Sequence, residues 1–276
     1  MFQRIVSGLV ALSIVLPVLI WGGVDGAKGL VGLVLLIVLY EFGPVASPER
    51  PKAAFGVMSV VGGAIYCLLS WGSSFSGSWA RLFPAMAGAA IVIGVAILLT
   101  WAMFAHEDPE EGALSGAVTA LSVPYIASAM AFIGLVRGFE PNGLEWLLFV
   151  LVATWATDTG AYFSGRFLGR TKLIERISPK KTWAGVWGGM ALTIAISVVW
   201  ASMSPLLPMV HAGVLGAFLA VSCVVGDLVE SMFKRARGIK DSGGIMPGHG
   251  GLFDRVDSLL FTMPVAWTYA VIFGLV

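Results

Sequence analysis

The sequence predicts an all-α, polytopic membrane protein with about nine transmembrane helices and a cytoplasmic N-terminus. Three observations predict this fold. Hydrophobic residues make up 58% of the chain and charged residues only 12%, whereas a soluble domain has about a quarter of its residues charged. The apolar residues come in runs of about 20, the length that spans a bilayer. Finally, the positive charges gather in alternate connections between these runs.

The apolar runs give the positions of the expected helices. Within lipid, helices are favoured because each backbone amide finds its partner inside its own segment. The first run follows Arg4 and has no A-x-A cleavage site, so we expect a retained helix and not a signal peptide. Cys67 and Cys223 lack metal-ligand spacing and are expected to be small buried hydrophobes. The expected spans are 4–22, 28–47, 53–72, 83–105, 114–136, 143–166, 183–203, 209–233 and 256–275.

The distribution of Lys and Arg predicts the orientation. With the N-terminus in the cytoplasm, only Lys28, Arg81 and Arg137 of the 17 basic residues fall outside, as the positive-inside rule requires. Two long basic loops, 166–182 and 234–255, then face the cytoplasm. We therefore expect residues 1–140 to form a scaffold of transmembrane helices that also offers dimer contacts. Residues 141–276 are expected to form the catalytic region.

Carboxylates inside the expected spans are the first sign of chemistry. Asp158 lies in the sixth span, and Asp227 and Glu230 lie in the eighth. A charged group near the bilayer centre costs about 3 kcal/mol even on lenient scales. Such a group is therefore paired, bound to a cation or placed in a water-filled cavity. For Asp158, an ion pair with an interior basic side chain is the structural alternative.

Helical spacing places Asp227, Ser231 and Lys234 on one face, at i, i+4 and i+7, with Glu230 and Arg235 beside them. A glycine-rich segment follows, and its backbone amides could cradle phosphates. Asp254 and Asp257 come next at i, i+3, where capping of the last helix is the structural alternative. Carboxylate oxygens and fixed cations beside such a segment suit Mg²⁺ and a polyphosphate. Phosphoryl and nucleotidyl transfer need this combination of groups.

The segment 231–257 resembles the signature of the phosphatidate cytidylyltransferase family. The pattern is S-x-x-K-R, four residues, K-D, and then P-x-H-G-G-x-x-D-R-x-D, and every fixed position is filled. Residues 155–166 and 177–185 look like the upstream motifs of the same family. One departure is Ala184, which stands where an acidic or amide residue is common before the glycine.

The resemblance implies that CTP and phosphatidic acid react to give CDP-diacylglycerol and pyrophosphate. It implies Mg²⁺ as cofactor, with K⁺ beside it, and Asp227, Asp254 and Asp257 as metal ligands. By motif position, the catalytic set is Asp227, Asp254, Lys234 and Ser231. The substrate-binding set is Arg235, Lys240, Asp241, His249, Ser178, Lys181, Thr182 and Asp158. The sequence does not assign individual roles to Asp158, Asp241 and His249.

The expected partners follow from these substrates. The lipid bilayer, CTP and phosphatidic acid are expected partners, and nucleic acid is not. The resemblance also implies a homodimer, and small-residue faces such as Gly185-x-x-x-Gly189 permit helix packing. The expected location is the inner membrane, with the active site facing the cytoplasm.

Two other functions compete with this interpretation. A cation-coupled transporter would use Asp158 and Asp227 as ion sites, but it predicts two repeated halves with broken helices, and the sequence shows no such symmetry. A CTP-dependent lipid kinase would phosphorylate an alcohol instead of transferring a nucleotide to a phosphate. The complete signature argues against the kinase.

Overall fold

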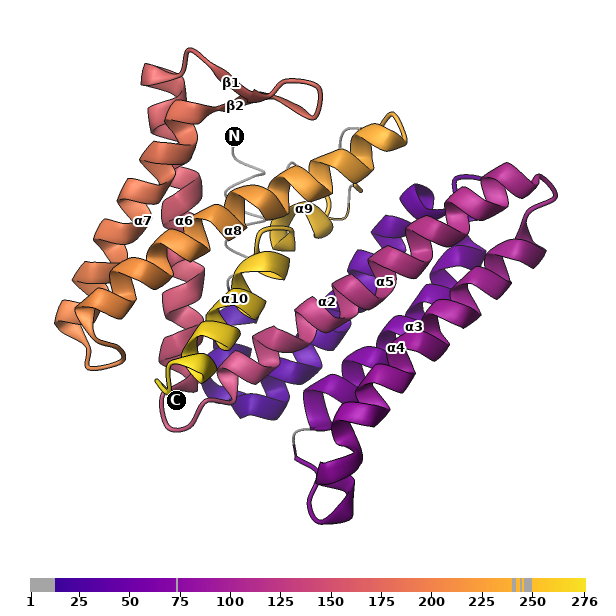
Figure 1. Ribbon diagram of the computed structural model, residues 1–276, viewed down its shortest axis with the longest axis horizontal. Coiled ribbons are helices and arrows are strands. Elements are labelled where there is room, and N and C mark those ends of the chain that lie inside the picture. The colour runs from indigo at the N-terminus through magenta and orange to yellow at the C-terminus, as the bar shows by residue number, and fades with distance from the viewer. Residues whose placement is uncertain (1–12, 73, 240–241, 244, 246–249) are drawn as a thin grey trace. The chain divides into compact units, whose positions relative to one another are not determined.

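The computed structural model is built almost entirely of helices (Figure 1). It describes residues 13–276 except 73, 240–241, 244 and 246–249. Within this part of the chain, seven helices are long and apolar enough to cross a membrane, which confirms a polytopic, all-α membrane protein. These helices are α2 (Gly23–Ala46), α3 (Pro51–Gly72), α4 (Ser78–Ala105), α5 (Pro109–Arg137), α6 (Gly143–Leu168), α7 (Trp183–Met203) and α8 (Met209–Ala236).

The two ends of the chain differ most from the expected spans. Residues 13–21 are helical, but Arg4 and the start of the first expected span lie outside the described residues. The last expected span, 256–275, corresponds to α10 (Leu259–Ile272), and a short helix, α9 (Phe253–Val256), precedes it across a two-residue break. The Ser258 N–H donates to Asp257 Oδ1 at 2.6 Å, and such a local side-chain bond competes with helical pairing.

The basic loop expected at 166–182 contains a β-hairpin, which the apolar pattern does not reveal. Strands β1 (Lys172–Ile174) and β2 (Ser178–Thr182) pair antiparallel, with Lys172 opposite Thr182. Thr182 ends β2 and caps α7, because its Oγ1 accepts a hydrogen bond from the Gly185 N–H at 3.2 Å. The hairpin therefore joins α6 to α7 (Figure 1).

The chain forms two compact units. The first unit is Met1–Gly134 with Asp241–Phe253, and the second is Leu135–Lys240 with Asp254–Val276. In the first unit α3 packs against α2 and α4. Gly62 permits a close approach there, because a Cβ at this position would lie 2.9 Å from Leu39 Cδ1 and 3.2 Å from Val123 Cγ1.

In the second unit, α6, α7, α8 and α10 pack together (Figure 1). A Cβ on Gly185 would lie 2.9 Å from the Ala161 carbonyl oxygen, and one on Gly189 would lie 2.8 Å from that of Thr157. The Gly185-x-x-x-Gly189 face therefore packs against α6 of the same chain. The homodimer stays a prediction that needs a different surface.

The expectation for the cysteines is half correct. Cys223 is buried as expected, whereas Cys67 is exposed on α3. A helix in a membrane is apolar all round, so an apolar surrounding sequence does not distinguish a protein-facing position from a lipid-facing one.

Candidate active site

Three carboxylates of the second unit converge where α8 passes the turn between α9 and α10. One oxygen each from Asp227, Glu230 and Asp257 lie within 4.8 Å of one another. Asp227 and Glu230 share a face of α8 because they are spaced i, i+3. Gly226 permits the approach of the turn, since a Cβ there would lie 2.7 Å from the Asp257 carbonyl oxygen. Glu230 and Asp257 are buried, so two of the three carboxylates lie away from water.

The electrostatics of the cluster suit a cation. Burial, followed by the charge of Asp227, raises the pKa of Asp257 to about 7, because both disfavour another negative charge there. Oxygen ligands on opposite sides of a Mg²⁺ ion lie about 4.2 Å apart, so small side-chain shifts would bring these three carboxylates to a shared ion. The donor set therefore fits a hard divalent cation.

Lys234 connects this cluster to Asp254. Its ammonium group lies 2.6 Å from Glu230 Oε2 and 2.6 Å from Asp254 Oδ1. Lys234 and Glu230 are both buried, and removing one partner of such a pair leaves an uncompensated charge. The structure thus brings Asp227 and Asp257 together with Glu230, while the Asp254 carboxylate is held by Lys234.

Asp227 is also tied to the β-hairpin. Lys181 Nζ on β2 lies 2.8 Å from Asp227 Oδ2. The Ser231 hydroxyl donates to Asp227 Oδ1 at 3.2 Å, as the i, i+4 spacing predicts. Two segments that both carry family-like motifs therefore meet at one carboxylate.

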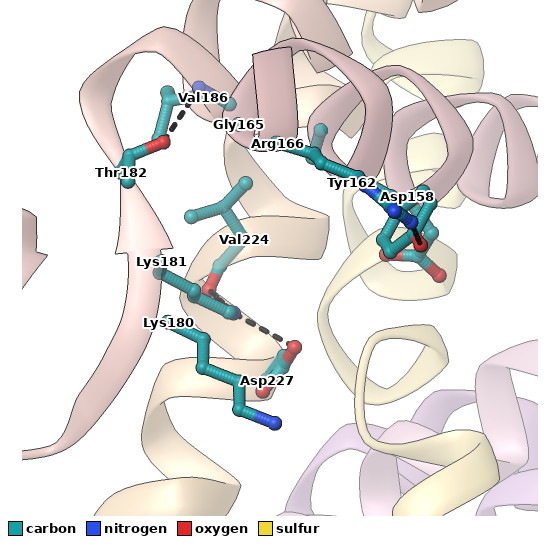
Figure 2. A pocket seen from close by; sticks show the side chains of 12 residues that line it. Asp158, Tyr162, Gly165, Arg166, Lys180, Lys181, Thr182, Val186, Val224 and Asp227 are labelled. Atoms are coloured by element: carbon teal, nitrogen blue, oxygen red, sulfur yellow. Dashed lines mark hydrogen bonds and ion pairs between the residues drawn. The ribbon is translucent and has the colours of Figure 1, made fainter. Parts of the chain in front are cut away.

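A cavity of about 390 Å³ opens beside this ion pair (Figure 2). Figure 2 shows Lys180 and Lys181 extending from β2 toward Asp227, while Tyr162 and Arg166 line the α6 side. Arg166 Nη1 donates to the Tyr162 hydroxyl at 2.6 Å. The wall combines charged and apolar side chains from α6, β2, α7 and α8: Asp158, Ala161, Tyr162, Gly165, Arg166, Lys180, Lys181, Thr182, Gly185, Val186, Val224 and Asp227.

Other predicted site residues take different positions. Asp158 lines the cavity and accepts a hydrogen bond from Cys223 Sγ at 3.5 Å. Thr182 lines it as well, although its hydroxyl oxygen caps α7. Ser178 starts β2 and is outside the cavity lining. Arg235 donates to the carbonyl oxygens of Ile177 and Ile239, so it fixes the hairpin turn to the end of α8.

Three predicted residues, Lys240, Asp241 and His249, lie outside the described residues. Conversely, the geometry adds residues that the predicted site omitted. Glu230 could have been included from its i, i+3 spacing to Asp227. Lys180, Arg166 and Tyr162 lie within or beside the quoted motifs, but no spacing rule indicates that they share a cavity with Asp227.

Comparison with known proteins identifies the family of this chain. The sequence model of the Cytidylyltransferase family matches residues 2–273. The chain belongs to this family. As a cytidylyltransferase it is a nucleotidyltransferase, which favours nucleotidyl transfer over both the transporter and the kinase alternatives. The match also includes the first unit, where the motifs gave no information.

Individual relatives carry a more specific description. The phosphatidate cytidylyltransferase of Bacillus subtilis is 32% identical over 286 residues, covering 99% of each chain. That of Pseudomonas aeruginosa is 34% identical over 277 residues, covering 95% of this chain and 94% of the relative. That of Brucella suis is 40% identical over 150 residues, about half of each chain.

Proposed function

We propose that this cytidylyltransferase joins CTP to phosphatidic acid, giving CDP-diacylglycerol and pyrophosphate at the cytoplasmic face of the inner membrane. One observation is the main support for this proposal. The Asp227, Glu230 and Asp257 carboxylates meet beside a cavity that also receives Lys181. Three acidic ligands and nearby fixed cations suit a metal-bound triphosphate, and the full-length relatives are named for this reaction.

The chemistry requires little proton transfer from the protein. The second pKa of a phosphate monoester is about 6, so the lipid phosphate is mostly a dianion at neutral pH and needs no general base. One of its oxygens attacks the α-phosphorus of CTP. The bond from this phosphorus to the oxygen that bridges to the β-phosphate breaks, and pyrophosphate leaves with the electron pair. Holding these groups in line and neutralising their charge is the main task of the site.

Asp227, Glu230 and Asp257 would hold Mg²⁺, and Asp254 would support them through Lys234. When bound, Mg²⁺ neutralises charge on the triphosphate and on the leaving pyrophosphate. Lys181, on β2, is paired with Asp227 and would supply a cation beside the metal ligands. Asp254 as a direct ligand and K⁺ as a second cation remain expectations from the family resemblance.

The cavity wall suits the lipid end of the reaction. Arg166 and Lys180 provide positive charge for a phosphate, while Ala161, Val186 and Val224 provide apolar surface for the glycerol and the first acyl carbons. Large apolar side chains on α6 and α7, including Phe167 and Trp187, are exposed, which suits contact with lipid. By the positive-inside rule, the basic charge of the hairpin supports a cytoplasmic location for this end of the unit.

Doubly labelled CTP in detergent tests the reaction. Label in the cytidine ring should enter the lipid, and label in the γ-phosphate should leave as pyrophosphate. Transfer of the γ-label to lipid would instead identify a kinase. Absence of both labels from the lipid at saturating Mg²⁺ would contradict catalysis on phosphatidic acid.

The remaining parts of the proposal concern organisation. Residues 1–140 would serve as a scaffold and 141–276 as the catalytic region, and two copies would form a homodimer. Light scattering in detergent with subtraction of the detergent mass distinguishes one copy from two.

A further inference from the structure

A buried carboxylate in the first unit, Glu41, lies beside the glycine-rich segment, although no motif includes it. Glu41 is in the last turns of α2 and is only 3% exposed. A carboxylate buried in an apolar helix is costly unless it receives hydrogen bonds. The Phe253 N–H supplies one, donating to Glu41 Oε2 at 2.9 Å. A hydrogen bond to an ionised acceptor is among the stronger kinds in proteins.

Phe42, the residue that follows Glu41, also contacts Phe253. The rings of Phe42 and Phe253 meet edge to face, with centroids 5.6 Å apart and planes at 79°. Both side chains are fully buried. Consecutive residues of α2 therefore fix Phe253 through its backbone and through its ring.

Two glycines leave room for the Glu41 carboxylate. A Cβ on Gly243 would lie 2.6 Å from Glu41 Oε1, and one on Gly251 would lie 2.7 Å from Glu41 Oε2. Both distances are shorter than the 3.0 Å that real Cβ atoms keep. The two glycines and the Phe253 amide thus surround the Glu41 carboxylate. This arrangement indicates a specific contact between Glu41 and the backbone of the glycine-rich segment.

We propose that Glu41 is a positioning residue for the reaction. By holding the backbone from Gly251 to Phe253, it fixes the residue that directly precedes Asp254, and Asp254 is the partner of Lys234. It acts as a hydrogen-bond acceptor for the backbone and does not touch the substrates. This inference rests on the proposed function, because Asp254 and Lys234 matter through the reaction assigned to them.

Glu41→Ala and Glu41→Gln in the full-length protein test this role. Because small displacements in a site can cost up to about a hundredfold in rate, Glu41→Ala should lower kcat about tenfold or more. The KM values for CTP and phosphatidic acid should change less than about threefold. Glu41→Gln keeps the length and one acceptor oxygen, so it should lose far less. Glu107→Ala, which removes an exposed carboxylate of the first unit, is the control.

A double-mutant cycle tests the contact itself. The three atoms nearest to a Cβ on Gly243 all belong to Glu41. Gly243→Ala should therefore lower kcat strongly in the wild-type background but hardly at all in the Glu41→Ala background, because contacting residues give non-additive effects. Additive effects would overturn the proposal, as would equal losses of kcat in Glu41→Ala and Glu41→Gln.

Hydrogen exchange of residues 250–256 separates this inference from the proposed function. Exchange should accelerate in Glu41→Ala and stay near the wild-type rate in Glu41→Gln. If the wild type transferred no cytidylyl group, the proposed function would fail, yet exchange would still test the contact. Unchanged exchange in Glu41→Ala, or faster exchange with normal kcat, would overturn the positioning role. If Glu41→Ala does not fold, Glu41→Asp is used in its place. The shorter Asp side chain moves the acceptor oxygens away from the Phe253 N–H, so the same results are expected.

Discussion

Lys181 on β2 and Asp227 on α8 form a 2.8 Å ion pair that joins two motifs separated by a transmembrane helix. Neither side chain is fully buried, so water and substrate can reach the pair. Its Coulomb energy alone is therefore modest. The more important consequence is geometric, because the pair places a cation of the hairpin beside the acidic cluster that would hold the metal.

Lys181→Ala should remove this cation while leaving the helices in place. Loss of one charge-stabilising group in an active site costs about 10² to 10³ in kcat, and we expect a loss of that size. Arg176 is exposed in the same hairpin, so Arg176→Ala is the matched control and should retain activity. Steady-state assays with both substrates varied provide the measurement, and a normal kcat in Lys181→Ala would remove Lys181 from the mechanism.

The acidic cluster predicts a metal site whose affinity can be measured without following turnover. Asp227→Asn and Asp257→Asn should each abolish activity and weaken binding of Mn²⁺, used as a paramagnetic substitute for Mg²⁺, because each removes a charged oxygen ligand. Glu175→Asn changes an exposed carboxylate of the hairpin and should leave Mn²⁺ binding intact. Electron paramagnetic resonance titration measures free Mn²⁺ directly. Wild-type affinity in both cluster variants would contradict the metal assignment.

Asp254 provides a comparison within the same site. Asp254→Asn should also abolish turnover, because it withdraws a carboxylate from Lys234. In the geometry of this structure, however, it should weaken Mn²⁺ binding less than Asp227→Asn does. An equal loss of Mn²⁺ affinity in the two variants would show that Asp254 is a direct ligand, as the motif suggested.

The sequence predicted the long helices well because apolar runs directly report the cost of placing polar groups in lipid. Thus α6 and α7 begin at the predicted residues, Gly143 and Trp183. The pattern missed the short break at Asp257 and Ser258, which separates α9 from α10 and where the Ser258 N–H bonds the Asp257 side chain. It also failed at the β1–β2 hairpin, whose short strands have no apolar alternation.

The site was only partly predictable for a related reason. Helical spacing brought Asp227 and Ser231 together correctly, since both lie on one helix. The proximity of residues in distant segments, such as Glu230 and Asp257 or Glu41 and Phe253, depends on helix packing that spacing does not encode. Gly226 illustrates this limit, because its importance appears only when the neighbouring backbone is placed against it.

Gly226→Ala should destabilise the second unit by separating α8 from the turn at Asp257. The added Cβ would lie 2.7 Å from the Asp257 carbonyl oxygen and 3.0 Å from Phe261 Cδ2, and overpacking of this kind costs about 1 to 3 kcal/mol. Gly213→Ala on the same helix is the control, because its nearest contact is at 3.7 Å. Thermal unfolding in detergent should show a lower midpoint for Gly226→Ala alone. Equal midpoints would contradict the close packing that forms the cluster.

Lys180→Ala should weaken the use of phosphatidic acid more than that of CTP, because Lys180 lies in the cavity whose wall combines cations with apolar surface. A hydrogen bond to a charged group contributes about 1.5 to 3 kcal/mol, so kcat/KM for the lipid should fall at least about tenfold. Arg170→Ala removes a nearby exposed cation outside the cavity lining and serves as the control for general surface charge. Assays in mixed micelles should vary the lipid at fixed surface dilution. A larger effect of Lys180→Ala on CTP than on lipid would mean that the cavity holds the nucleotide, and the assignment of the two substrates would then be reversed.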